Sequence, residues 1–139
     1  MKVTWEQIQS LCNWHLIKAP DIIIGIARGG LIPATILSYR FGAPLYLLNC
    51  QSFGSDGTRG KVQARISEEL KQVLGRPQKV LLVDDIADTG QTLFAAHQLI
   101  GTCESFSLVY KPTSSYKPTY PGILFDSEDW VDFPWDPAP

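Results

Sequence analysis

The segment from Val80 to Leu93, VLLVDDIADTGQTL, limits the possible folds of this chain more than any other. It begins with a short apolar run, and two adjacent acids, Asp84 and Asp85, follow that run, with a third acid at Asp88. The apolar run predicts a buried strand, and the Thr-Gly-Gln-Thr sequence after the acids predicts the start of a helix. The chain therefore carries three carboxyl groups where a buried strand gives way to a helix.

Strands and helices alternate along the rest of the chain. Apolar runs predict strands over residues 21–26, 44–50, 79–84 and 106–111, and a short one over 123–125. Helical spacing of apolar residues predicts helices that start at about Thr4, where Gln7 completes a capping box, and that cover residues 31–41, 62–74 and 90–100. This order is typical of an α/β fold, in which helices cover both faces of a parallel sheet.

The chain has 139 residues, a size that suits one domain. Its last part is rich in proline and aromatic residues and has little strand or helix pattern. We therefore expect a single domain over residues 1–139, with a core over about 20–111. A small C-terminal hood would be formed by residues from about 112–139 together with the N-terminal helix.

Composition limits the kind of partner and the compartment. The net charge of −2 gives no basic surface for nucleic acid, and no apolar run approaches the ~20 residues of a membrane-spanning helix. Three cysteines, Cys12, Cys50 and Cys103, lie far apart and without metal-ligand spacing, which indicates reduced thiols. We therefore predict a cytoplasmic protein with a small-molecule partner, with no nucleic acid and no membrane span.

The acids predict a ligand site at one edge of the sheet. In an open α/β sheet, ligands bind outside the carboxyl ends of the strands, so the acids should lie beside Arg28, Gly29 and Lys111. The N-terminus of the helix after Gly90 suits a phosphate. Ionised Asp84 and Asp85 suit sugar hydroxyls or a hydrated Mg²⁺. Together these features predict a sugar phosphate site.

A structural explanation of the acids is also open. Asp84 and Asp85 could end the strand while Asp88 or Thr89 caps the helix. A cap needs one acid rather than three, so the whole motif favours a ligand site. Because adjacent side chains of a strand point to opposite faces, Asp84 and Asp85 should also make a poor metal cage by themselves.

The segment VLLVDDIADTGQTL resembles the ribose-phosphate motif of the type I phosphoribosyltransferases, which use 5-phosphoribosyl 1-pyrophosphate (PRPP). The segments VTWEQIQ, IIIGIARGGLIPATILSYRFG, LVYKPTS and DWVDFPWD resemble, in order, the short xanthine-guanine branch, so the resemblance covers nearly the whole chain. It implies a parallel sheet flanked by helices, a homo-oligomer (dimer or tetramer), and Mg²⁺ as cofactor. The implied activity is purine salvage: transfer of 5-phosphoribose from PRPP to guanine, xanthine or hypoxanthine, giving the nucleoside monophosphate and pyrophosphate.

The resemblance also implies which residues bind PRPP. Asp84 and Asp85 would hold the ribose hydroxyls, with Mg²⁺ reached only indirectly, through PRPP. Arg28 and Gly29 would lie in a pyrophosphate loop that often has a cis peptide. The remaining implied PRPP contacts are Arg59, Ala87, Asp88, Thr89, Gly90, Gln91 and Thr92.

The resemblance implies other residues for purine binding and for catalysis. By resemblance, Lys111 would donate to the oxygen at purine position 6, Trp130 would stack on the base, and Val131 would offer its backbone. Asp88 would handle the proton on N7, so Asp88 and Lys111 are the implied catalytic residues. One departure is Phe53 after Ser52, where relatives often have Ser-Tyr in a loop that closes over the reaction.

Two other functions share the same motif. A non-catalytic regulator of this fold would bind PRPP and control RNA or DNA, but it would need a basic face or a DNA-binding extension. An accessory subunit would carry a vestigial site, whereas Asp88 and Lys111 are intact here. The sequence therefore favours the enzyme.

Overall fold

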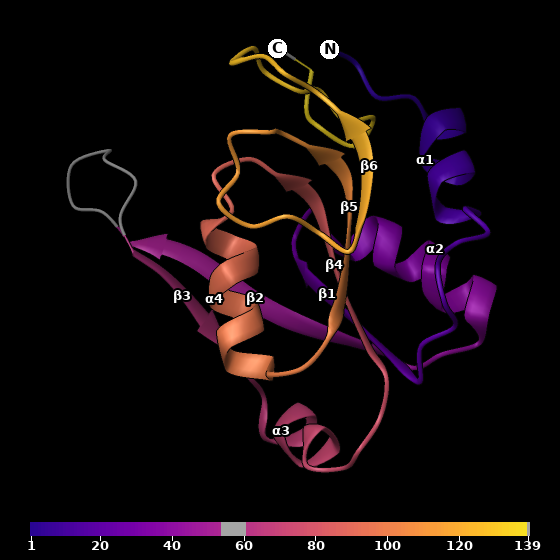
Figure 1. The fold of residues 1–139 in the computed structure, drawn as a ribbon, viewed down its shortest axis with the longest axis vertical. Coiled ribbons are helices and arrows are strands. Elements are labelled where there is room, and N and C mark those ends of the chain that lie inside the picture. The colour runs from indigo at the N-terminus through magenta and orange to yellow at the C-terminus, as the bar shows by residue number, and fades with distance from the viewer. Residues whose placement is uncertain (54–60, 139) are drawn as a thin grey trace.

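The computed structural model describes residues 1–53 and 61–138 and has a six-stranded sheet between helices (Figure 1). The strands run in the order β3-β2-β1-β4-β5-β6 across the sheet. Their bounds are β1 Ile22–Ala27, β2 Leu45–Phe53, β3 Lys61–Arg65, β4 Val80–Ala87, β5 Glu104–Tyr110 and β6 Tyr120–Leu124. The helices are α1 Trp5–Cys12, α2 Leu31–Phe41, α3 Glu68–Leu74 and α4 Gln91–Ile100. The predicted α/β class is confirmed.

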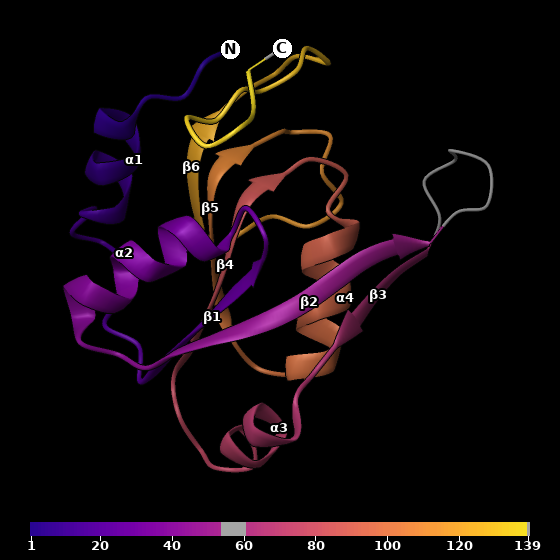
Figure 2. The same ribbon diagram turned by 180° about the vertical axis from the view of Figure 1, so that it is seen from behind.

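Helices α1 and α2 lie on one side of the sheet, and α3 and α4 lie on the other (Figures 1 and 2). Each side of the sheet has its own hydrophobic core, and the central strands β1 and β4 contribute side chains to both cores. On β4, Leu81 and Val83 pack toward α1 and α2, whereas Leu82 packs toward α3 and α4. A strand covered on both faces is apolar at successive positions rather than at alternate ones. This burial explains the continuous apolar runs of β1 and β4.

One predicted element is wrong. Residues 62–74 were expected to form one helix, but 61–65 form β3, which pairs antiparallel with β2 from Asn49↔Arg65 to Phe53↔Lys61. Only Glu68–Leu74 is helical, and the Ser67 hydroxyl caps it by accepting from the Leu70 N–H. Val62 and Ile66 are four positions apart, a spacing that fits period 2 as well as a helix. The sheet is therefore mixed rather than wholly parallel.

The other elements differ from their predicted bounds only at the ends. The strand that carries the acids continues through them to Ala87, and the strand after α4 begins at Glu104. The predicted short strand over 123–125 is observed as β6, Tyr120–Leu124. Helix α1 begins after Thr4, whose hydroxyl accepts from the Gln7 N–H, and the predicted capping box is present.

The two ends of the chain lie close together at one end of the sheet (Figure 1). The Val3 N–H donates to the Asp132 carbonyl at 2.8 Å, and the Asp132 N–H donates to the Met1 carbonyl at 2.9 Å. The Trp135 ring stacks on Phe133 with centroids 4.8 Å apart. The C-terminal segment is thus packed against the N-terminal one, and its separation from the core as a hood stays a prediction.

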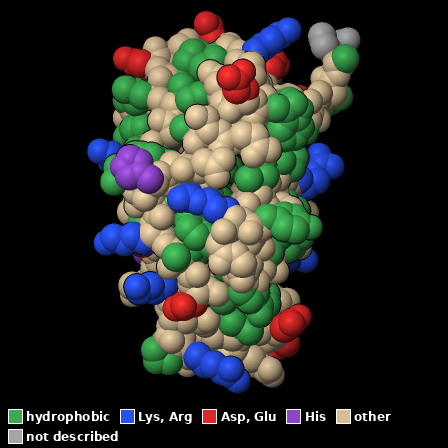
Figure 3. All heavy atoms as spheres, turned by 90° about the vertical axis from the view of Figure 1, so that its right-hand side faces the viewer, with side chains coloured by type: hydrophobic (Ala, Val, Ile, Leu, Met, Phe, Trp, Pro, Cys, Tyr) green, Lys and Arg blue, Asp and Glu red, His purple; other side chains and the backbone are tan. Residues whose placement is uncertain are grey.

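The distribution of charged side chains on the surface is relevant to the predicted absence of a nucleic-acid partner. On the side of α1 and α2, Lys and Arg side chains are scattered among acidic and hydrophobic ones rather than gathered in one patch (Figure 3). Within the described part of the chain, no helix is both long and apolar enough to cross a membrane.

Candidate active site

Two neighbouring cavities open at the carboxyl ends of the parallel strands. The larger has a volume of about 1000 Å³ and extends toward the C-terminal segment, and the smaller has a volume of about 360 Å³ and lies over the start of α4. Both are lined by Asp85, Ile86, Asp88 and Thr89. The acidic motif therefore forms the wall between the two cavities.

The smaller cavity brings together almost all of the predicted PRPP contacts. Those that line it are Arg28, Gly29, Asp84, Asp85, Ala87, Asp88, Thr89, Gly90, Gln91 and Thr92. Arg59 is the exception, because it lies outside the described residues. Helix α4 follows Gly90, which has the left-handed φ of +89°. Backbone N–H groups at a helix N-terminus suit a phosphate group in this cavity.

The loop after β1 is pressed against β4. The Ala27–Arg28 peptide is cis, in the loop where the resemblance implied such a bond. A Cβ atom on Gly29 would lie 1.9 Å from Oδ2 of Asp85. A Cβ atom on Gly30 would lie 2.6 Å from the Val83 carbonyl oxygen. A Cβ atom on Gly30 would meet backbone atoms, so this position requires glycine, whereas one on Gly29 would meet only the Asp85 side chain. Gly29 brings the loop backbone directly onto a proposed ribose-binding carboxylate.

Asp84 and Asp85 both bond to the backbone of β4. Each carboxylate turns back to accept from the next backbone N–H, Asp84 Oδ1 from Asp85 at 2.9 Å and Asp85 Oδ1 from Ile86 at 2.8 Å. The two side chains also interact with each other. Strand β4 continues through both residues with its pairing to β5 intact, and the charge of Asp84 acts on Cys50 whereas that of Asp136 acts on Asp85. The expectation that the two side chains project to opposite faces stays a prediction.

Both acids have raised pKa values. Burial, and then the charge of Asp85, raise the pKa of Asp84 well above its usual range. Burial also raises the pKa of Asp85, and its hydrogen bond with Asp84 lowers it in part. Burial therefore disfavours the charged form of both acids, and Asp84 is the more buried of the two.

We predict that Asp84→Asn makes the ligand-free protein more stable at neutral pH. The raised pKa of Asp84 means that the folded state binds this proton more tightly than the unfolded chain, so stability is lost as pH rises from the unfolded pKa through the folded one. An amide keeps the hydrogen-bonding oxygen and carries no charge, so the free energy of unfolding should rise by about 1 kcal/mol or more. Urea unfolding at neutral pH measures this gain.

The gain should disappear at a pH below the usual aspartate range, where both states are protonated. Asp126→Asn, at an exposed acid of the larger cavity, is the matched control and should change stability at neither pH. Equal stability of Asp84→Asn and wild type at neutral pH would contradict the raised pKa of Asp84.

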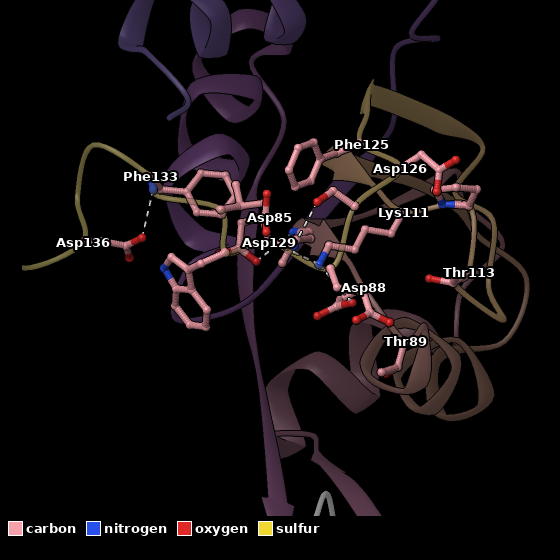
Figure 4. Close-up of a pocket in the computed structure, with 16 residues that line it drawn as sticks. Asp85, Asp88, Thr89, Lys111, Thr113, Phe125, Asp126, Asp129, Phe133 and Asp136 are labelled. Atoms are coloured by element: carbon pink, nitrogen blue, oxygen red, sulfur yellow. Dashed lines mark hydrogen bonds and ion pairs between the residues drawn. The ribbon is translucent and has the colours of Figure 1, made fainter. Parts of the chain in front are cut away.

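Lys111 projects into the larger cavity and meets Asp88 there (Figure 4). Its Nζ lies 3.6 Å from Asp88 Oδ1 and 3.5 Å from the Asp129 carbonyl oxygen. It also lies 5.9 Å from the centre of the Phe125 ring. Although it follows the last residue of β5, Lys111 is only 8% exposed. The two predicted catalytic side chains are thus brought together at the junction of the cavities.

Val131 and Trp130 line the same cavity but differ in exposure. Val131 is buried, whereas Trp130 is 77% exposed and lies at the rim. An indole at the rim can cover one face of a flat ligand while its own opposite face stays in contact with solvent. The stacking role of Trp130 stays a prediction.

Several lining residues were missed by the sequence reasoning. Phe125 follows β6, so the strand-end rule applied to the predicted strand over 123–125 would have found it. Phe133 and Asp136 lie in the segment DWVDFPWD, and the Phe133 N–H donates to Asp136 Oδ2 at 2.8 Å (Figure 4). The charge of Asp136 also helps to raise the pKa of Asp85. Only the tertiary fold brings this acid near β4.

The fold is an α/β sheet with two adjoining cavities at the carboxyl ends of its parallel strands. Residues 7–139 match the phosphoribosyl transferase domain family. The chain therefore belongs to the phosphoribosyltransferase family of enzymes, and its relatives place it among the purine phosphoribosyltransferases.

Curated relatives include the xanthine-guanine phosphoribosyltransferase of Nitratidesulfovibrio vulgaris strain Hildenborough. It is 31% identical over 141 residues, which cover 96% of this chain and 83% of the relative. The enzyme of the same name from Chromohalobacter salexigens is 27% identical over 96% of this chain and 82% of its own length. Among solved structures, a purine phosphoribosyltransferase from Pyrococcus horikoshii Ot3 superposes with a TM-score of 0.80 at 31% identity, covering 100% of this chain and 95% of the other.

Proposed function

We propose that this protein transfers 5-phosphoribose from PRPP to a 6-oxopurine, namely guanine, hypoxanthine or xanthine, and releases pyrophosphate. The observation that carries the proposal is the Lys111–Asp88 pair, 3.6 Å apart where the two cavities meet. A purine in the larger cavity and PRPP in the smaller one would meet at this point. The names of the relatives support the same class of base.

The larger cavity suits an oxopurine. The ammonium of Lys111 would donate to the oxygen at position 6, and Val131 would offer backbone groups to the opposite edge. Phe125 and Trp130 supply apolar surface for the purine faces. Asp88 would accept the N7 proton as N9 bonds to C1 of the ribose.

The smaller cavity suits PRPP. Thr89–Thr92 would bind the 5-phosphate at the start of α4, and Asp84 and Asp85 would accept from the ribose hydroxyls. As the C1–pyrophosphate bond breaks, positive charge develops on the ribose and negative charge on the leaving group. Arg28 would stabilise the pyrophosphate. Arg59 would have the same role, but this residue lies outside the described part of the chain.

We also propose Mg²⁺ as a cofactor that arrives with PRPP. Within the described residues, no group of three or more His, Cys, Asp or Glu side chains could hold a metal ion alone. Asp84 and Asp85 do supply the oxygen donors that Mg²⁺ accepts. This donor set fits an ion that takes most of its ligands from PRPP and water. When bound, the ion would neutralise charge on the pyrophosphate.

The test is pyrophosphate release with PRPP, Mg²⁺ and each of guanine, xanthine, hypoxanthine and adenine. The exocyclic group of adenine at position 6 is a donor, and so is Lys111, so adenine should react at least about 10²-fold less efficiently than the best oxopurine. Chelating Mg²⁺ should abolish release. Adenine turnover comparable to that of guanine would contradict the assignment of Lys111.

The same assay separates the alternatives. A non-catalytic regulator would bind PRPP and release no pyrophosphate with any base, and a vestigial subunit would do neither. A homo-oligomer, either a dimer or a tetramer, remains a proposal taken from the sequence resemblance. A cytoplasmic location is proposed because Cys12, Cys50 and Cys103 are free thiols, as in a reducing compartment.

A further inference from the structure

The segment after β5, residues 111–116, is hydrogen-bonded to the end of β4 and to the loop between β4 and α4. Ser115 donates twice to the carbonyl oxygen of Thr89, from its backbone N–H and from its hydroxyl, each at 2.9 Å. Nearer β5, the Lys111 N–H donates to the Ala87 carbonyl at 3.0 Å. The segment therefore contacts the end of β4 through the backbone of the proposed catalytic lysine, and it contacts the loop after β4 through Ser115.

The bonds to Thr89 control the direction of a peptide group. In a trans peptide the C=O and the following N–H point in opposite directions within one plane. Holding the Thr89 oxygen toward Ser115 therefore turns the Gly90 N–H away from Ser115. Thr89 and Gly90 both line the smaller cavity, whereas Ser115 does not. This arrangement suits an N–H group that must face a phosphate there.

Close packing around Gly90 gives a second, independent observation. A Cβ atom on Gly90 would lie 2.5 Å from the Tyr116 backbone nitrogen, 2.7 Å from Ser114 Oγ and 2.8 Å from Ser115 Oγ. The segment thus covers the outer side of the loop without room for a methyl group. Gly90 is required by this contact as well as by its left-handed φ of +89°.

We infer that Ser115 is a positioning residue for the 5-phosphate of PRPP, acting through the Thr89–Gly90 peptide. Its hydroxyl keeps this peptide in the orientation that presents the Gly90 N–H to the smaller cavity. Ser115 does not itself touch the ligand. The inference rests on the proposed function, because it takes the 5-phosphate to bind at the start of α4.

The experiment compares Ser115→Ala, Ser115→Thr and Ser38→Ala with wild type. Ser38 is a matched control because its hydroxyl also donates to a backbone carbonyl, that of Ala43 at 2.6 Å, and it lines neither cavity. Steady-state kinetics give KM for each substrate, calorimetry gives the Kd for PRPP with Mg²⁺, and thermal melting reports the fold.

Ser115→Ala should raise both KM and Kd for PRPP by about 3- to 10-fold, the effect of one neutral hydrogen bond, while the backbone bond of Ser115 remains. The KM for guanine should stay within about twofold of wild type. Ser115→Thr keeps a hydroxyl and should restore PRPP affinity. Ser38→Ala should lower the melting temperature and leave both KM values unchanged.

Three results would overturn the inference. One is an unchanged PRPP affinity in Ser115→Ala in a protein that otherwise turns over normally, which leaves the proposed function intact. Another is an equal rise of both KM values in Ser115→Ala and Ser38→Ala, which would show a general loss of stability. If wild type neither binds PRPP nor releases pyrophosphate, the proposed function fails and the inference fails with it.

Discussion

Asp88→Asn should lower kcat by about 10²-fold or more, with the affinity for PRPP changed by less than about threefold. The amide keeps the size of the side chain but cannot accept the N7 proton. Asp88 lines both cavities, and its Oδ1 lies 3.6 Å from the Lys111 ammonium. A neutral amide is also a weaker partner for that ammonium, so the KM for the purine should change more than that for PRPP.

Asp126→Asn serves as the control for Asp88→Asn, because it removes another carboxylate from the wall of the larger cavity. It should leave kcat within about twofold of wild type. Steady-state kinetics with the best oxopurine, together with calorimetric titration of PRPP with Mg²⁺, measure both effects. A kcat for Asp88→Asn within about threefold of wild type would show that another group accepts the proton.

Gly29→Ala should weaken the binding of PRPP by about 10²-fold, since hydrogen bonds to a charged group contribute about 1.5–3 kcal/mol each. The added Cβ would lie 1.9 Å from Oδ2 of Asp85, so this carboxylate must move. Moving it breaks its hydrogen bond with the Ile86 N–H, now 2.8 Å long, and disturbs its contact with Asp84. Gly29→Ala should therefore disturb the carboxylates that we propose bind the ribose hydroxyls.

Two further glycines make this test specific. Gly75→Ala places a Cβ no closer than 3.3 Å to the Gln72 carbonyl, at an ordinary φ of −69°, and should leave binding and stability unchanged. Gly30→Ala would meet the backbone oxygens of Val83 at 2.6 Å and Ile26 at 2.7 Å, which cannot move aside. It should lower the melting temperature, whereas Gly29→Ala should mainly lower affinity. Wild-type affinity in a folded Gly29→Ala would contradict the role of Asp85.

The sequence by itself determined the features that depend on neighbouring residues. The capping box of Thr4 and Gln7 needs only four consecutive positions, and it is present as predicted. Apolar runs long enough to be covered on both faces determined β1 and β4, and the acids after such a run determined where a site lies. The lining of the smaller cavity follows from this rule, because the ends of adjacent parallel strands meet at one edge of the sheet.

The tertiary structure alone decided what depends on residues far apart in the chain. The spacing of Val62 and Ile66 fits both helix and strand, and pairing of residues 61–65 with β2 selected the strand. The raised pKa of Asp84 follows mainly from its burial, which no local pattern states. The bonds from Ser115 to Thr89 exist because β5 runs beside β4 and returns the chain to that loop. Local pattern therefore determined which residues line the smaller cavity, and non-local packing determined how those residues are held and how their pKa values are shifted.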